Sequence, residues 1–215
     1  MNDLTPGFWR INNDDLKFVE ELFINGFDGS MLGRFEESFA EAFDAKYAIA
    51  VNSGTSALHA AMHSLGIGPG DEVIVPPLTF IATAFAPMFV SAIPVFADIN
   101  PETFLIEPKE IEKKITDKTK AIITVSLYGL SPDMDSIMKI ASKHNLKIIE
   151  DNAQCVYGKY NDQLVGSFGD IAIYSLQRSK HLTSGDGGIV ITSDAEIAEK
   201  CRKFCDLGYK RLTAK

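Results

Sequence analysis

Two side chains in the stretch from residue 146 to residue 188 have the types and spacing that covalent chemistry on a ring would need. Asp151 follows an apolar, strand-like run at 146–149, and a second such run at 171–174 leads into Ser175. Lys180 lies five residues beyond that serine. A lysine amine can form an imine with an aldehyde, and a carboxylate can keep a ring nitrogen protonated so that the ring takes up electrons. We therefore expect Asp151 and Lys180 to act as catalytic groups on one ring.

A helix start after the first apolar run offers a place for a phosphate group. The segment 53–56 (SGTS) follows a strand-like run and opens a helical pattern. The free N–H groups and positive dipole end of a helix N-terminus suit an anion. Gly54 permits close approach, and the hydroxyls of Thr55 and Ser56 can donate to phosphate oxygens. Taken alone, the pattern is more often an ordinary helix cap.

An amine, an acid and a phosphate site are together what pyridoxal 5'-phosphate requires, and two further residues could contact its ring. Phe80 follows the second strand-like run and could stack on a flat cofactor, while Gln154 could lie against it. Each also has an ordinary explanation, Phe80 as a core aromatic and Gln154 as a partner of backbone groups. Asp151 could equally cap a turn, and Lys180 could be a solvated surface lysine. Their combination favours the cofactor.

Seven short apolar runs separated by helical patterns predict a mostly parallel sheet. The runs lie at 47–51, 72–76, 93–97, 121–125, 146–150, 170–174 and 188–192. Segments long enough for crossover helices separate the first five, which is typical of a three-layer α/β/α fold. The connection from Ser175 to Gly187 is too short for such a helix, so we expect the seventh strand to be antiparallel to the sixth.

The polar candidates follow three of these strands at the point where each strand ends. Residues 52–56 follow the first strand, Asp151 the fifth and Ser175 the sixth. Because ligands of such sheets bind at the carboxyl ends of the strands, we expect these residues to converge on one edge.

Composition and charge exclude several classes of protein. The 215 residues are 46% hydrophobic, enough for one large core, and the net charge of -8 disfavours nucleic acid as a partner. There is no apolar run of 18 residues and no signal-peptide pattern, so we expect a cytoplasmic protein with no membrane partner. The three cysteines, Cys155, Cys201 and Cys205, are few and odd in number, so we expect reduced thiols. His59 and His63 are four residues apart, as are Cys201 and Cys205, but neither pair has further candidate ligands nearby. We therefore expect no metal site.

With these residues assembled, the chain resembles the DegT/DnrJ/EryC1/StrS sugar aminotransferases, which are pyridoxal phosphate enzymes of fold type I. Six ordered motifs within residues 29–192 carry the resemblance: NSGTSALHAAMHSLGIGPGDEVIVPPLTFIATA, IPVFADINPETFLI, LYGLSPDMD, IIEDNAQ, VGSFGDIAIYS, and Lys180 with LTSGDGG. The resemblance implies that most of the chain is the large domain of this fold, with a seven-stranded sheet.

The resemblance also implies a role for each candidate residue. Lys180 would bind the cofactor aldehyde and later move a proton between substrate and cofactor. Asp151 would hold the pyridinium nitrogen protonated. Phe80 would stack on one ring face, and Gln154 would lie by the other face or near the phenolic oxygen. The phosphate ligands would be Gly54, Thr55 and Ser175, with Ser56 as a weaker candidate.

Several positions bear on the reaction and the substrate. A related dehydratase branch has histidine in place of the lysine, so Lys180 favours transamination. Ser126 stands where a histidine is common, Cys155 replaces a small residue, and Asp186 replaces a glutamate. These departures weaken a substrate assignment more than the cofactor assignment. Gln177 resembles the branch that acts on keto-cyclitols.

The function implied by the resemblance is transfer of an amino group from glutamate or glutamine to a nucleotide-linked keto-sugar or a related keto-cyclitol, in amino-sugar and polysaccharide biosynthesis. One alternative is a fold-type I lyase. Another is a truncated, catalytically incomplete half that binds the cofactor and dimerises. A nicotinamide-binding domain is disfavoured because GxGxxG is absent after the first strand.

We expect three parts along the chain: an N-terminal helical segment at 1–46, a cofactor-binding large domain at 47–207, and at 208–215 the start of a linker toward a C-terminal small domain that is absent here. The chain would then be a fragment, a truncated gene product or a split enzyme. In the first part, phenylalanines at 35, 39 and 43 predict a helix with one packed face. The resemblance implies a homodimer, to which this phenylalanine-rich region could contribute.

Overall fold

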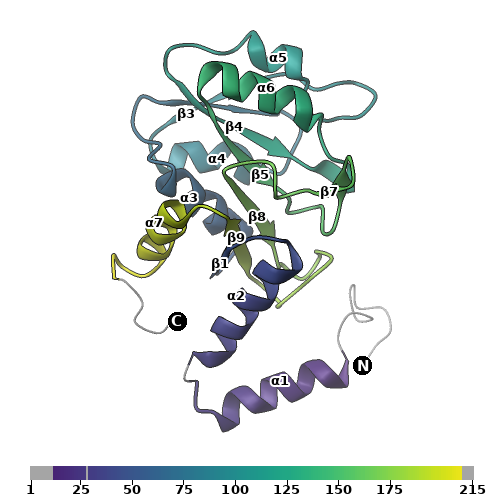
Figure 1. The fold of residues 1–215 in the computed structure, drawn as a ribbon, viewed down its shortest axis with the longest axis vertical. Helices are drawn as coiled ribbons and strands as arrows, with labels where there is room; N and C mark the ends of the chain where they lie inside the picture. The colour runs from purple at the N-terminus through teal and green to yellow at the C-terminus, as the bar shows by residue number, and fades with distance from the viewer. Residues whose placement is uncertain (1–11, 28, 210–215) are drawn as a thin grey trace.

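A seven-stranded sheet forms the centre of the structure, a computed structural model that describes residues 12–27 and 29–209 (Figure 1). The strand order is β1-β9-β8-β5-β4-β2-β3. β9 is antiparallel to both neighbours, whereas the other pairs in this sheet are parallel, as the sequence predicts. The strands are β1 (Tyr47–Val51), β2 (Glu72–Val75), β3 (Ile93–Phe96), β4 (Thr119–Val125), β5 (Lys147–Asp151), β8 (Ile171–Ser175) and β9 (Gly188–Thr192).

Helices cover both faces of this sheet, because consecutive residues of the central strands are buried on opposite sides. Ile149 belongs to the apolar cluster under α3, α4 and α7, whereas Ile148 belongs to the cluster under α5 and α6. A third cluster lies under α2. The three-layer α/β/α architecture is therefore confirmed. The helices are α1 (Asn13–Ile24), α2 (Ser30–Ala42), α3 (Gly54–Ser64), α4 (Ala82–Phe89), α5 (Pro108–Glu112), α6 (Met134–His144) and α7 (Ala195–Cys205).

The crossover helix between β3 and β4 is short and occupies only part of the segment between these strands. α5 ends at Glu112. Beyond it, the N–H of Thr116 donates to the hydroxyl of Thr119 at 2.9 Å, and the N–H of Lys118 donates to the hydroxyl of Thr116 at 3.1 Å. Such side-chain bonds give the backbone an alternative to the helical ladder. They explain the early helix end.

α2 connects the N-terminal part of the chain to the sheet. Phe39 and Phe43 are buried against Tyr174, with ring centroids 5.4 and 4.6 Å from the tyrosine ring. Phe35, one turn earlier, is partly exposed, so two of the three phenylalanines form the packed face. α1 has no buried residue and extends away from the sheet (Figure 1).

The expected division of the chain at residues 46 and 207 remains a prediction. Residues 1–11, where a signal peptide would begin, and 210–215 of the expected linker lie outside the described part. Within residues 12–27 and 29–209, no helix has both the length and the apolar character needed to cross a bilayer.

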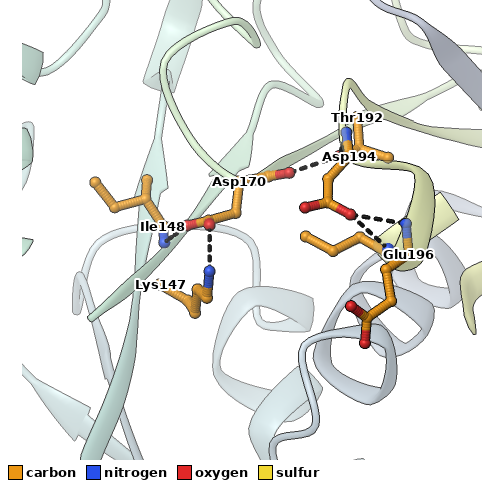
Figure 2. Close-up of polar contacts among 7 residues, drawn as sticks. Lys147, Ile148, Asp170, Thr192, Asp194 and Glu196 are labelled. Atoms are coloured by element: carbon orange, nitrogen blue, oxygen red, sulfur yellow. Dashed lines mark hydrogen bonds and ion pairs between the residues drawn. The ribbon is translucent and has the colours of Figure 1, made fainter. Parts of the chain in front are cut away.

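At the amino end of the sheet, Asp170 links β5, β8 and β9 (Figure 2). Its carboxylate accepts from the amine of Lys147 at 2.7 Å and from the N–H of Ile148 at 2.9 Å. Its backbone carbonyl accepts from the hydroxyl of Thr192 at 2.7 Å. The same hydroxyl accepts from the N–H of Asp194, the cap of α7. These bonds fix the end of the sheet that lies away from the predicted site.

A small hairpin of β6 (Lys159–Tyr160) and β7 (Gln163–Leu164) was not predicted, because two-residue strands show no periodicity. Behind it, the buried carboxylate of Glu150 accepts from three backbone N–H groups at 2.6–2.8 Å, those of Gly166, Phe168 and Gly169. Burial raises the pKa of Glu150, and these bonds act in the opposite direction. Glu150 therefore anchors the segment that leads into β8.

Candidate active site

A cavity of about 410 Å³ lies at the carboxyl ends of β1, β5 and β8. Its lining includes Asp151 at the end of β5, Ser175 at the end of β8 and Lys180 in the loop that follows. Because these strands are parallel to one another, the residues at their exits meet at one edge. A larger cavity of about 910 Å³ lies beside the β6–β7 hairpin, and none of the candidate residues lines it.

Asp151 carries a buried carboxyl group, with 5% of the residue exposed. Its Oδ1 accepts a hydrogen bond from the N–H of Ala153 at 3.1 Å, and its Oδ2 accepts from the hydroxyl of Thr83 at 2.9 Å. Burial raises the pKa of Asp151, while the two hydrogen bonds and the nearby charge of Lys180 act in the opposite direction. A basic ring nitrogen beside this acid would gain a proton and pair with it.

Lys180 lies in a loop whose shape is set by its own hydrogen bonds. The N–H of Lys180 donates to the carbonyl of Gln177 at 2.8 Å. The Oε1 of Gln177 accepts from the N–H and the hydroxyl of Ser179, at 2.8 and 2.6 Å. Lys180 is half-buried in the cavity lining, and no hydrogen-bond acceptor in the described part of the chain contacts its amine. The amine is therefore available to an aldehyde.

The first turn of α3 forms another part of the cavity wall. Ser53 is the N-cap, and its Oγ accepts from the N–H of Ser56 at 3.1 Å. Among the described residues no acceptor contacts the N–H groups of Gly54 and Thr55, so two donors remain at the positive end of the helix. Ser175 lies close by: a Cβ added to Gly54 would be 2.9 Å from the Cβ of Ser175. Glycine allows this approach.

Ser56 occupies the same helix end but does not line this cavity. Its Oγ lies 3.0 Å from the Oγ of Ser53. It lines a separate cavity, which also includes His59 and Cys205. The structure therefore brings three of the four expected phosphate ligands together and places Ser56 outside.

Phe80 and Gln154 both line the cavity. Phe80 precedes α4 and is 65% exposed, so core packing does not occupy its ring. The Oε1 of Gln154 accepts from the N–H of Tyr128 at 3.2 Å. Tyr128 has a left-handed backbone with φ of 52°, in the 3-10 turn at Leu127–Gly129. The amide nitrogen of Gln154 remains a donor for a ring oxygen.

These groups fit the chemistry of pyridoxal phosphate. Two backbone N–H groups and a serine hydroxyl suit a phosphate, a buried acid suits a ring nitrogen, and an amine suits an aldehyde. The apolar walls suit a flat ring, and they include Leu58, Val125 and Ile173. The cavity volume lies within the range usual for small-molecule sites, about 300–1,000 Å³.

Thr83, which donates to Asp151, was not identified by sequence reasoning. It is completely buried in α4, whose sequence ATAFAPMF is otherwise apolar or alanine. A hydroxyl in a buried apolar run needs a partner, and that was the available signal. Thr79 and Ser179 also line the cavity without having been predicted, whereas Ser53 belongs to the predicted segment 53–56.

Comparison with known proteins identifies relatives of this chain. The sequence model of the DegT/DnrJ/EryC1/StrS aminotransferase family matches residues 10–215. The chain is 49% identical over 208 residues to the UDP-N-acetyl-3-dehydro-alpha-D-glucosamine 3-aminotransferase of Acidithiobacillus ferrooxidans, covering 94% of this chain and 56% of that protein. It is 42% identical over 167 residues to the L-glutamine:2-deoxy-scyllo-inosose aminotransferase of Micromonospora echinospora, covering 78% and 40%.

A solved structure agrees with the fold. NtdA of Bacillus subtilis, crystallised with the bound cofactor PMP, superposes with a TM-score of 0.81 at 35% sequence identity, covering 90% of this chain and 45% of that one. The chain spans about half the length of the curated relatives it matches.

Replacing Asp151 by asparagine should stabilise the chain in the absence of cofactor near pH 7. The folded-state pKa of Asp151 is raised, so its contribution to stability is present at low pH and lost as the pH rises through that pKa. Thermal unfolding followed by circular dichroism should show a higher Tm for Asp151→Asn, by roughly 2–4 °C for each kcal/mol. The difference should shrink as the pH falls below the carboxyl's ordinary value.

Asp117→Asn, at an exposed turn, is the matched control and should follow the parent at every pH. A lower Tm for Asp151→Asn at all pH values would show that burial of the carboxylate does not oppose folding.

Proposed function

This chain belongs to the DegT/DnrJ/EryC1/StrS aminotransferase family, and we propose that it forms the pyridoxal phosphate site of an enzyme that transfers an amino group to a ring ketone. The observation that carries the proposal is the convergence of Lys180, Asp151 and the first turn of α3 on one cavity. A reactive amine, a buried acid and an anion site have no shared use in a purely structural domain. As pyridoxal phosphate chemistry needs all three, the cavity supports that cofactor.

The relatives support an acceptor class for the whole protein. Their names specify a UDP-linked dehydro sugar in one case and a scyllo-inosose in the other. One name also specifies L-glutamine as the donor. We therefore propose a nucleotide-linked keto-sugar or a keto-cyclitol as acceptor and glutamate or glutamine as donor, in amino-sugar and polysaccharide biosynthesis.

The walls of the cavity would hold the cofactor at three points. The N–H groups of Gly54 and Thr55 and the hydroxyl of Ser175 would bind its phosphate. Phe80 would cover one ring face and exclude water from it. Gln154 would donate to the phenolic oxygen from its amide nitrogen. When bound, the cofactor supplies an electron sink that stabilises negative charge on the carbon beside the migrating amine.

Asp151 and Lys180 would perform the acid–base work. Asp151 would hold the proton on the ring nitrogen, since its carboxylate lies in a buried site where a positive partner is favoured. Lys180 would move a proton at its Nζ from the α-carbon of the amino-acid donor to the cofactor in the first half of the reaction, and from the cofactor to the acceptor carbon in the second half. The presence of lysine rather than histidine at this position supports transamination over dehydration.

The whole protein is proposed to act in the cytoplasm as a homodimer. Exposed apolar side chains gather on α1, which has no buried residue, and include Leu16, Phe18 and Phe23. Exposed apolar surface of this kind marks association surfaces. Light scattering on the purified chain at micromolar concentration should give about twice the monomer mass; a mass of one chain at all concentrations would contradict the dimer.

Adding pyridoxal phosphate to the purified chain should produce a visible absorption band, and L-glutamate should then remove it. The band depends on the amine of Lys180, and its loss depends on transfer of the donor's amino group. Lys180→Ala should not develop the parent's band. Lys200→Ala, on an exposed face of α7, is the matched control and should behave as the parent.

Other outcomes separate the alternatives. The same band in the parent and in Lys180→Ala would exclude the proposed role of Lys180. A band that ignores both glutamate and glutamine would favour a half that binds the cofactor without catalysis. Breakdown of an amino acid without conversion of the cofactor to its amine form would favour a lyase.

A further inference from the structure

Two threonines form a hydrogen-bonded chain behind the catalytic acid. The hydroxyl of Thr83 lies 2.9 Å from the Oδ2 of Asp151, and the hydroxyl of Thr79 lies 3.0 Å from that of Thr83. Building on the proposed function, we propose that Thr83 is a positioning residue that keeps Asp151 ionised and aimed at the ring nitrogen, with Thr79 orienting Thr83.

The environment of Thr83 leaves its hydroxyl little choice of partner. The residue is completely buried, and its neighbours Ala82, Ala84, Ala86 and Pro87 in α4 are also buried and apolar. A threonine inside a helix often returns its hydroxyl to a carbonyl one turn earlier. Here the hydroxyl instead crosses from α4 to β5 and reaches the carboxylate.

The direction of these two hydrogen bonds follows from the number of protons that each group can donate. Each threonine hydroxyl has one proton to donate. An ionised Asp151 can only accept, so Thr83 donates to it, and Thr83 can then only accept from Thr79. If Asp151 were protonated on Oδ2, that group would donate to Thr83, and the hydroxyl of Thr83 would then be free to donate to Thr79. Hydrogen bonds donated from Thr79 to Thr83 and from Thr83 to Asp151 therefore require Asp151 to be ionised.

Thr83 is the side-chain donor to Asp151 among the described residues. The other donor is the backbone N–H of Ala153, on the opposite oxygen, which no substitution removes. The titratable side chains that line the cavity with Asp151 are Lys180 and Asp186, while α3, α4, β4 and β8 contribute none to its lining. The hydroxyl of Thr83 is therefore the side-chain group that lowers the pKa of Asp151 by hydrogen bonding.

Thr79 connects this pair of hydrogen bonds to the lining of the cavity. Thr79 lines the cavity, and it directly precedes Phe80, the aromatic residue expected to cover the ring. The carbonyl of Phe80 also accepts from the N–H of Thr83, at 3.1 Å. The loop that carries the aromatic cover is thus tied to the acid beneath the ring.

The test compares Thr83→Val, which keeps the shape and removes the donor, with Thr83→Ser, which keeps the donor. In the cofactor-free chain, Thr83→Val raises the pKa of Asp151 further, so extra stability is lost as the pH rises through that pKa. We expect Tm to fall by about 4–8 °C near pH 9 and by about 2 °C near pH 4. Thr83→Ser should stay close to the parent at both.

An Asp151→Asn background separates positioning from packing. Asparagine does not ionise, so the pH dependence of the Thr83→Val effect should vanish in the double variant. A Tm loss that is equal at all pH values, or that keeps its pH dependence with asparagine present, would overturn the inference. If Thr83→Val does not fold, Thr79→Val removes the second donor, and its Tm loss should be smaller with the same pH dependence.

The visible band of added pyridoxal phosphate gives a second reading. A weaker acid leaves less positive charge on the ring nitrogen, so the nitrogen of Lys180 that is joined to the cofactor holds its proton to higher pH. The midpoint of the band's pH titration should rise by about 0.5–1 pH unit in Thr83→Val and return with serine. An unchanged midpoint would contradict the role. If even the parent forms no band, the proposed function fails, while the melting curves still decide the inference.

Discussion

The carboxylate of Asp151 is buried at the centre of a parallel sheet, and the arrangement of the cavity depends on how it is held. A carboxylate without partners in such a place would take up a proton. Ala153 and Thr83 each donate to one of its oxygens, and Lys180 adds an opposite charge. Because β5 pairs with both β4 and β8, the backbone that carries Asp151 is held on both sides. These partners oppose the effect of burial, which raises the pKa of Asp151, and they favour a negative charge where a cationic ring nitrogen would bind.

Sheet topology brings the remaining groups to that charge. β1, β5 and β8 run in the same direction, so the first turn of α3, Asp151 and Ser175 share one edge. β9 returns antiparallel, which keeps the loop with Lys180 at the same edge; a crossover helix would have carried the chain to the other end. Asp170 bonds to the backbone of β5 at the opposite end of the sheet (Figure 2). Glu150 holds the segment that leads into β8. The lysine and the acid are thus positioned by backbone direction.

The strands could be predicted because short apolar runs separated by helical patterns are local signals, and the antiparallel return could be predicted because the connection from Ser175 to Gly187 is short. The same signals placed Asp151 and Ser175 at strand exits. The bond from Thr83 to Asp151 joins residues 68 positions apart and depends on how α4 is rotated against β5, which no local pattern encodes. Ser56 was expected beside the phosphate, yet packing rotates α3 so that this side chain lines another cavity. The spacing of residues along the sequence predicts which of them lie at the carboxyl edge of the sheet. Tertiary packing decides which of their side chains point into the cavity.

Reduction with borohydride in the presence of pyridoxal phosphate tests most directly whether Lys180 is the reacting lysine. The reagent makes the link between the cofactor and a lysine permanent, and peptide mass spectrometry then locates it. A pyridoxyl group on Lys180, at close to one per chain, is the predicted result. Label spread over exposed lysines such as Lys114 and Lys118, with none on Lys180, would contradict the assignment of this cavity as the cofactor site.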